Sequence, residues 1–76
     1  MEITLDRLWT DQSAEVTQIR TPPALALRLG QLGMVPGTRV RCRYRSPGGS
    51  VTALEFRGSV LALRTRDLKR IWGRCE

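Results

Sequence analysis

The chain has 76 residues, 41% of them apolar, a net charge of +6 and no histidine. A chain of this length folds as a single domain, residues 1–76, and buries only about 60% of the surface that it exposes when unfolded. So thin a core argues against an enzyme. The absence of histidine argues the same way, because histidine is the side chain that most often serves as general base and metal ligand. No apolar run approaches the ~20 residues of a membrane span, and the N-terminus lacks the layout of a signal peptide, so we expect a cytoplasmic protein.

The first predicted element is a short capped turn, in which Thr4 is the cap and Leu5 and Leu8 share one face. Residues 14–19 form the first predicted strand, because Ala14 and Val16 alternate with polar residues, and Ile19 breaks the alternation, which predicts a bulge or the strand end there. A helix then opens at Thr21, a favoured N-cap residue followed by two prolines of the kind tolerated in a first helical turn.

The predicted helix carries one apolar stripe, since Leu25, Leu29 and Leu32 stand at positions i, i+4 and i+7. Gly33 ends it, as a residue free to adopt positive φ. Residues 35–38, Val-Pro-Gly-Thr, have the proline and glycine placement of a type II turn.

Residues 38–45 give the clearest strand in the chain, because polar and apolar residues alternate without a break. The alternation predicts Val40, Cys42 and Tyr44 on the inner face. The outer face then carries four arginines, called here the arginine ladder: Arg39, Arg41, Arg43 and Arg45.

The rest of the chain is predicted to be short strands joined by turns. A loop at residues 46–50 precedes a strand over 51–57, and Gly58 turns the chain into a strand over 59–64. Residues 65–68 form one helical turn, and 69–72 a last strand. Short, glycine-hinged strands remove their free edges by closing. We therefore expect a mainly β fold, a small SH3-like five-stranded barrel with one helix between the first and second strands.

Chemically reactive groups are few. Cys42 and Cys75 are too few for a structural zinc site; we expect Cys42 to be a small buried hydrophobe and Cys75 a free, exposed thiol. The seven carboxylates are scattered, with no pair at metal-ligand spacing. We therefore predict no catalytic residue, no metal site and no cofactor.

The excess of basic over acidic residues suits an anionic partner: nucleic acid, an anionic lipid surface or an acidic protein face. Side chains of the arginine ladder stand ~7 Å apart and could grip phosphates or carboxylates, although such rows are more often a solvated strand face. Tyr44, expected on the opposite face, offers these arginines no stacking partner, which argues against nucleic acid. Trp9 and Trp72 are expected to pack together near the barrel seam, or one of them to anchor a partner.

Two motifs together resemble a known family. Residues 29–38, Leu-Gly-Gln-Leu-Gly-Met-Val-Pro-Gly-Thr, are similar to the signature L-x-x-L-G-[ML]-x-P-G-[ST]. Arg57-Gly58, followed by residues 61–64, Leu-Ala-Leu-Arg, is similar to a later R-G-x-x-L-A-L-R stretch. Both belong to the ferrous iron transport protein A family, FeoA, and the resemblance covers nearly the whole chain.

The resemblance implies an SH3-like barrel and a small accessory protein that binds and modulates FeoB, a ferrous iron transporter of the bacterial inner membrane with a cytosolic GTP-hydrolysing domain. Iron(II) would then be handled by the transporter, and the protein would reach the membrane through it. The arginine ladder would meet acidic protein or anionic lipid there. The signature loop, which also has a purely structural explanation as a helix cap and turn, is expected to contact the partner through side chains that stay partly exposed. The expected contact residues are Leu32, Gly33, Met34, Val35, Pro36, Gly37 and Arg64.

Two alternatives remain beside that function. One is a basic nucleic-acid-binding barrel. The other is a metal-sensing regulatory module, since an SH3-like domain of this kind also occurs in iron-dependent repressors. The residues are compatible with either a monomer or a homo-oligomer.

Overall fold

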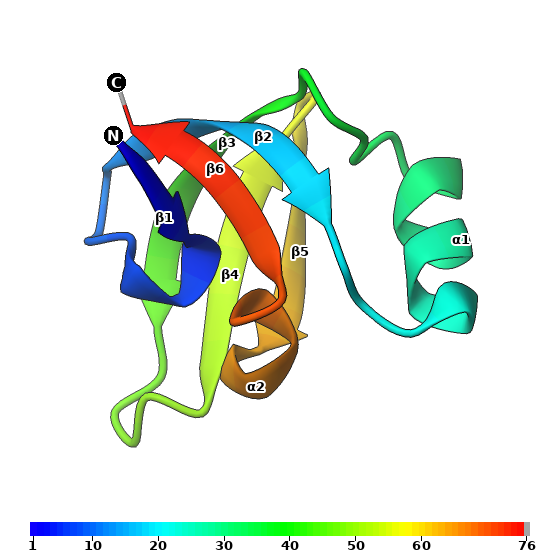
Figure 1. Cartoon of the computed structure of the whole chain (residues 1–76). Coiled ribbons are helices and arrows are strands. Elements are labelled where there is room, and N and C mark those ends of the chain that lie inside the picture. Colours follow the sequence, from blue (N-terminus) through cyan, green and yellow to red (C-terminus); the bar gives the residue numbers. More distant parts are fainter. Residues whose placement is uncertain (76) are drawn as a thin grey trace.

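The computed structural model describes residues 1–75. One antiparallel sheet of six strands, in the order β1-β6-β2-β3-β4-β5, curls around the core, and a helix projects from one side (Figure 1). The elements are β1 (Glu2–Thr4), the 3-10 turn η1 (Leu5–Arg7), β2 (Ser13–Ile19), α1 (Pro23–Gln31), β3 (Arg39–Arg45), β4 (Val51–Phe56), β5 (Ser59–Arg64), α2 (Thr65–Leu68) and β6 (Ile71–Cys75). None of the helices described is long and apolar enough to cross a bilayer.

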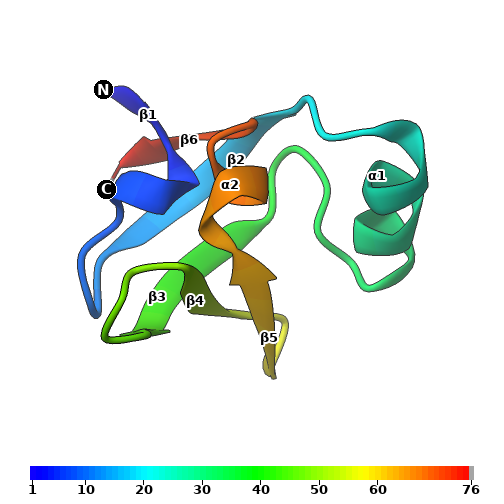
Figure 2. The ribbon, with the colours of Figure 1, turned by 90° about the horizontal axis from the view of Figure 1, so that it is seen from below.

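The core fills the inside of the curled sheet. Its buried members come from every strand except β1, from η1, α1 and α2, and from two loop positions, and α2 lies across one opening of the sheet (Figure 2). The buried apolar residues are Leu5, Leu8, Ala14, Val16, Leu29, Met34, Val40, Cys42, Leu54, Phe56, Leu63, Leu68 and Ile71.

The expectation of a closed five-stranded barrel is wrong in two respects. A sixth strand, β1, pairs with β6, and within residues 1–75 no ladder joins the end strands β1 and β5. The last strand is also displaced from the predicted residues 69–72. Lys69 caps α2 and the N–H of Arg70 donates to Asp67 O, so the strand begins only at Ile71.

A β-bulge in β3 corrects the predicted alternation. Cys42 pairs with Leu54 but Tyr44 pairs with Ala53, which leaves Arg43 as the extra residue of the bulge. A one-residue slip moves each following side chain to the other face. Tyr44 is therefore 56% exposed rather than inward, and Arg45 shares the face of buried Thr52 rather than of the other arginines.

Helix α1 stands off the sheet, with Leu29 as its one fully buried side chain (Figure 1). Its N-cap is Pro22, not Thr21 as predicted, and the Thr21 hydroxyl is buried without capping a helix N–H. At its other end Gly33 adopts a φ of +98° and ends the helix as predicted. Met34 N–H then donates to Leu29 O, and the N–H of Gly33 to Gly30 O, which is a Schellman cap.

The two ends of the chain lie side by side. The pairing of β1 with β6 joins them, and the N–H of Cys75 donates to Met1 O at 3.0 Å. Figure 1 shows the start of β1 and the end of β6 at one corner of the molecule, away from α1 and α2.

Candidate functional site

A groove of about 370 Å³ lies between α1 and β5. Its floor and walls are leucines, and charged side chains line its rim. The lining apolar residues are Leu25, Leu29 and Leu32 of α1 and its cap, with Leu61, Ala62 and Leu63 of β5, and the charged ones are Arg28, Arg64 and Asp67.

The helical wall of the groove is the predicted apolar stripe. Three leucines at helical spacing face β5: Leu25 is half-buried, Leu29 is fully buried and Leu32 is 47% exposed. The opposite wall is an edge strand, since β5 pairs with β4 alone in the described part of the chain. The outer backbone groups of β5 are therefore available to a further strand.

The signature loop between α1 and β3 is held by hydrogen bonds to its own backbone. The Thr38 hydroxyl donates to Gly33 O and accepts from the N–H of Val35. Arg57 Nε donates to the same Gly33 oxygen at 2.9 Å, which ties the β4–β5 hairpin to the end of the helix. Gly37 has a φ of +97°, as a turn glycine requires.

The structure separates the predicted contact residues of the loop. Met34 is 0% exposed, so the expectation that its side chain reaches the surface is wrong: it packs in the core as the residue that follows the capping glycine. Val35 is 39% exposed, and Pro36 and Gly37 are exposed beside it. Leu32, together with Arg64 from a distant part of the chain, lines the groove.

The arginine ladder is largely engaged within the molecule. Arg41 pairs with Asp11 at 3.2 Å and Arg43 with Glu55 at 3.3 Å. Arg45 donates to two backbone oxygens near η1, those of Leu8 and Asp6. The prediction of four parallel cations on one strand face is therefore wrong at Arg45, and Arg41 and Arg43 have carboxylate partners.

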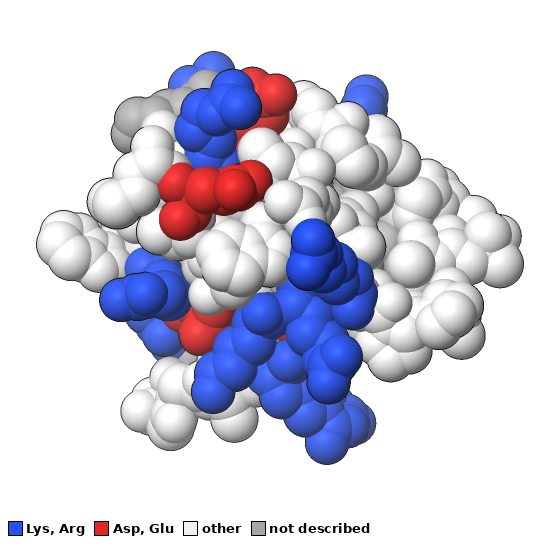
Figure 3. Space-filling view, in the orientation of Figure 1, with Lys and Arg blue, Asp and Glu red and all other residues white. Residues whose placement is uncertain are grey.

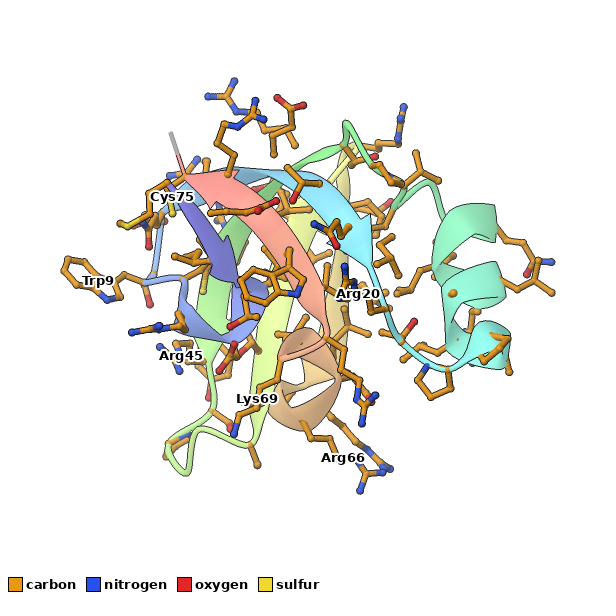
Figure 4. All side chains as sticks on the ribbon, in the orientation of Figure 1. Trp9, Arg20, Arg45, Arg66, Lys69 and Cys75 are labelled. Atoms are coloured by element: carbon orange, nitrogen blue, oxygen red, sulfur yellow. The ribbon has the colours of Figure 1, made fainter. Side chains whose placement is uncertain are left out.

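A second basic region was missed by sequence reasoning. Arg20, Arg66, Lys69 and Arg70 are all exposed, and we call them the α2 basic face. Figure 3 shows the basic side chains gathered over α2 and the start of β6, and Figure 4 shows how Arg20, Arg66 and Lys69 lie. Three basic residues within 66–70 are a sequence signal for part of this face. Arg20, which completes it, is far away in the sequence.

The two tryptophans do not both take the predicted place at a seam. Trp9 is 75% exposed, and Figure 4 shows it pointing away from the molecule. Trp72 is half-buried in β6, opposite Thr4 on one side and Gln18 on the other.

The two cysteines are free thiols in different surroundings. Cys42 is buried as predicted, and burial raises the pKa of its thiol. Cys75 is half-buried rather than exposed, and its sulfur accepts from Gln12 Nε2 at 3.5 Å. Among residues 1–75, no three His, Cys, Asp or Glu side chains gather as a metal ligand set would.

The thiols should therefore differ in reactivity. With iodoacetamide at mildly alkaline pH, Cys75 of the folded protein is expected to react on the order of 100-fold faster than Cys42, because the thiolate is the nucleophile and a core residue reacts only after opening. Mass spectrometry of peptides after timed labelling measures both rates. Denaturant should abolish the difference, and equal rates in the folded protein would contradict the buried placement of Cys42.

A curled antiparallel sheet with one projecting helix defines a small SH3-like β domain. A FeoA domain model matches residues 3–75, so the chain belongs to the FeoA family, which is associated with ferrous iron transport. No curated protein gives a significant sequence match.

Solved structures of the family agree. FeoA from Chlorobium tepidum is 27% identical with a TM-score of 0.93, covering 96% of this chain and 70% of that chain. FeoA from Stenotrophomonas maltophilia, a prokaryotic SH3 domain protein complexed with zinc, is 31% identical with a TM-score of 0.80, covering 97% of this chain and 89% of that one. A manganese-dependent transcriptional repressor shares the fold at 14% identity and a TM-score of 0.87. The match covers 99% of this chain and 42% of the repressor chain.

Proposed function

We propose that this protein is an accessory protein of bacterial ferrous iron uptake, which binds and modulates a FeoB-type transporter through the groove between α1 and β5. The groove carries the proposal, because it brings together Leu32 and Arg64, two residues that we expected from the sequence to contact the partner and that lie far apart in the sequence. Membership in a transport-associated family supplies the context.

The groove suits an extended apolar segment of the transporter's cytosolic part. The outer edge of β5 offers its backbone hydrogen-bonding groups, and the leucines beside it offer pockets for every second side chain, as in binding by strand addition. Arg28 and Arg64 at the rim complement an acidic residue on that segment. Iron(II) is cargo of the transporter in this proposal, and the protein works at the cytoplasmic side of the inner membrane through its partner.

The alternatives have less support. The repressors share the fold with this chain at 14–16% identity, and a likeness at that level is no evidence for a shared function. Zinc is present in the Stenotrophomonas relative, but residues 1–75 here bring no three metal-ligating side chains together. The nucleic-acid function rested on the arginine ladder, whose Arg41 and Arg43 are paired with carboxylates.

Substitution in the groove tests the proposal. Leu32→Asp is expected to weaken binding to the purified cytosolic domain of the transporter by roughly 10- to 100-fold, since it removes an apolar anchor worth about 1.5–3 kcal/mol. Calorimetry or biolayer interferometry measures the affinity. Because Leu32 is 47% exposed, the variant should fold.

The matched control is Leu27→Asp. Leu27 belongs to the same helix and is 66% exposed, but it lies off the stripe and does not line the groove. This variant should bind like the wild type and restore anaerobic iron(II) uptake in cells that lack the protein, whereas Leu32→Asp should not. Equal binding by the two variants would remove the groove from the proposal, and no binding by the wild type would refute the partner.

A further inference from the structure

The α2 basic face gathers cations from separate parts of the chain. Arg20 follows the end of β2, Arg66 lies in α2, and Lys69 and Arg70 form the turn into β6. The N–H of Arg20 donates to Arg70 O at 2.8 Å, so the pairing of β2 with β6 fixes these two residues as neighbours. Figure 3 shows a broad basic patch at this place.

The charges of this face are not neutralised within the part of the chain that the structure describes. None of its four side chains makes an ion pair there. Arg66 stands three and four residues before Lys69 and Arg70, a spacing at which like charges on a helical turn repel. The acidic residue of α2, Asp67, is half-buried and lines the groove instead.

This arrangement differs from that of the arginine ladder, where carboxylates accompany Arg41 and Arg43. A cluster of like charges without carboxylate partners repels itself and so lowers the stability of the isolated domain. An anionic partner relieves this repulsion. The neighbouring pocket of about 450 Å³ places Ser50 beside Arg64, Arg66 and Lys69, and the hydroxyl and cationic groups of these side chains are donors that suit phosphate oxygens.

The distribution of the cations favours a surface over a strand of nucleic acid. The four residues come from three segments and spread in two dimensions, whereas a single-strand binder aligns its cations along a groove with exposed aromatic rings between them. The exposed aromatic residues of the described chain, Trp9 and Tyr44, lie on the loop before β2 and on β3, not in this face.

We propose that the α2 basic face binds the anionic phospholipid headgroups of a bilayer surface. Each basic residue near such a surface raises partitioning about fivefold, so four of them raise it on the order of 10³-fold. Contact of this strength is reversible and sensitive to salt, and it needs no inserted segment.

That this bilayer is the membrane that holds the transporter rests on the proposed function. Arg64 lines both the headgroup-sized pocket and the apolar groove, so the two surfaces meet along β5 and α2. A protein resting on the bilayer through this face holds its groove at the level of the headgroups. Binding to lipid then raises the effective concentration of the groove at a membrane transporter.

Vesicle binding tests the inference. The variant Arg20→Gln/Arg66→Gln/Lys69→Gln is compared with the control Arg39→Gln/Arg41→Gln/Arg43→Gln, and each lowers the net charge from +6 to +3. Sedimentation with phosphatidylcholine vesicles, with and without phosphatidylglycerol, measures partitioning at about 0.05 M and about 0.5 M salt. Circular dichroism confirms that both variants fold.

The wild type should bind the anionic vesicles at low salt and not the neutral ones. The α2-face variant should lose on the order of 100-fold in partitioning, and the ladder control should keep most of it. Equal losses in both variants would overturn the inference, because net charge alone would then explain binding.

Three further results would also overturn it: no binding by the wild type, release by glycerol phosphate at a matched phosphate concentration, and α2-face binding to single-stranded DNA in place of vesicles. The affinity for the transporter's cytosolic domain, measured without lipid, reports separately on the proposed function.

Discussion

Replacing Met34 with aspartate is expected to unfold the protein rather than to detach it from a partner. Met34 is 0% exposed, and its backbone N–H closes the helix cap on Leu29 O. Removal of a buried methionine side chain costs about 2–5 kcal/mol, and an unpaired carboxylate in its place adds several more. That sum exceeds the roughly 5 kcal/mol that stabilises so small a domain.

Far-UV circular dichroism and amide proton dispersion would show the loss of structure at 25 °C. The neighbouring Val35→Asp serves as control, because Val35 is 39% exposed and should leave the fold intact. A folded Met34→Asp with wild-type melting would mean that the side chain is not in the core. Loss of iron uptake with Met34→Asp would therefore say nothing about the contact surface, which is why Leu32→Asp is the informative variant.

Gly73→Ala is expected to destabilise the fold by about 1–3 kcal/mol, the usual cost of overpacking a tight site. A Cβ at Gly73 would lie 2.9 Å from Leu5 Cδ2 and 3.2 Å from both Ala14 Cβ and Glu15 O. The Glu15 oxygen belongs to the backbone of β2, which cannot retreat without disturbing its pairing with β6.

For a domain of this size, a loss of 1 kcal/mol lowers the melting temperature by roughly 4–8 °C, so thermal unfolding resolves the effect easily. The matched control is Gly48→Ala, because a Cβ there meets nothing within 4 Å. Equal melting temperatures for the two variants would mean that β6 does not approach η1 and β2 as closely as described.

Sequence pattern located the elements whose periodicity is long enough to read. The strands over 14–19, 51–57 and 59–64 and the α1 stripe appear nearly where alternation and helical spacing put them. β1 was missed because a strand of three residues is too short to show a period. β6 was predicted too early in the sequence because Lys69 caps α2 and the N–H of Arg70 bonds back to that helix. The bulge at Arg43 was invisible for a different reason: it depends on how β3 pairs with β4.

The candidate site shows the same division between local and distant causes. Leu32 was predicted from the helical stripe, and the burial of Met34 could have been predicted, since the residue after a Schellman glycine commonly packs on the helix. Pairing of Arg41 with Asp11 and the meeting of Arg20 with Arg70 depend on strands brought together by folding. No local pattern records them, so the α2 basic face was not predicted from the sequence.

The joined ends of the chain bear on how such a domain is used in larger proteins. Because a backbone hydrogen bond joins Cys75 to Met1, a host chain can enter and leave at one corner, and the domain can be inserted into a loop or circularly permuted through a short linker. That corner lies away from α1 and α2, so a fused domain leaves the groove and the basic face uncovered (Figure 1). A manganese-dependent repressor shares this fold over 42% of its own chain, so the fold also occurs as one part of a longer chain.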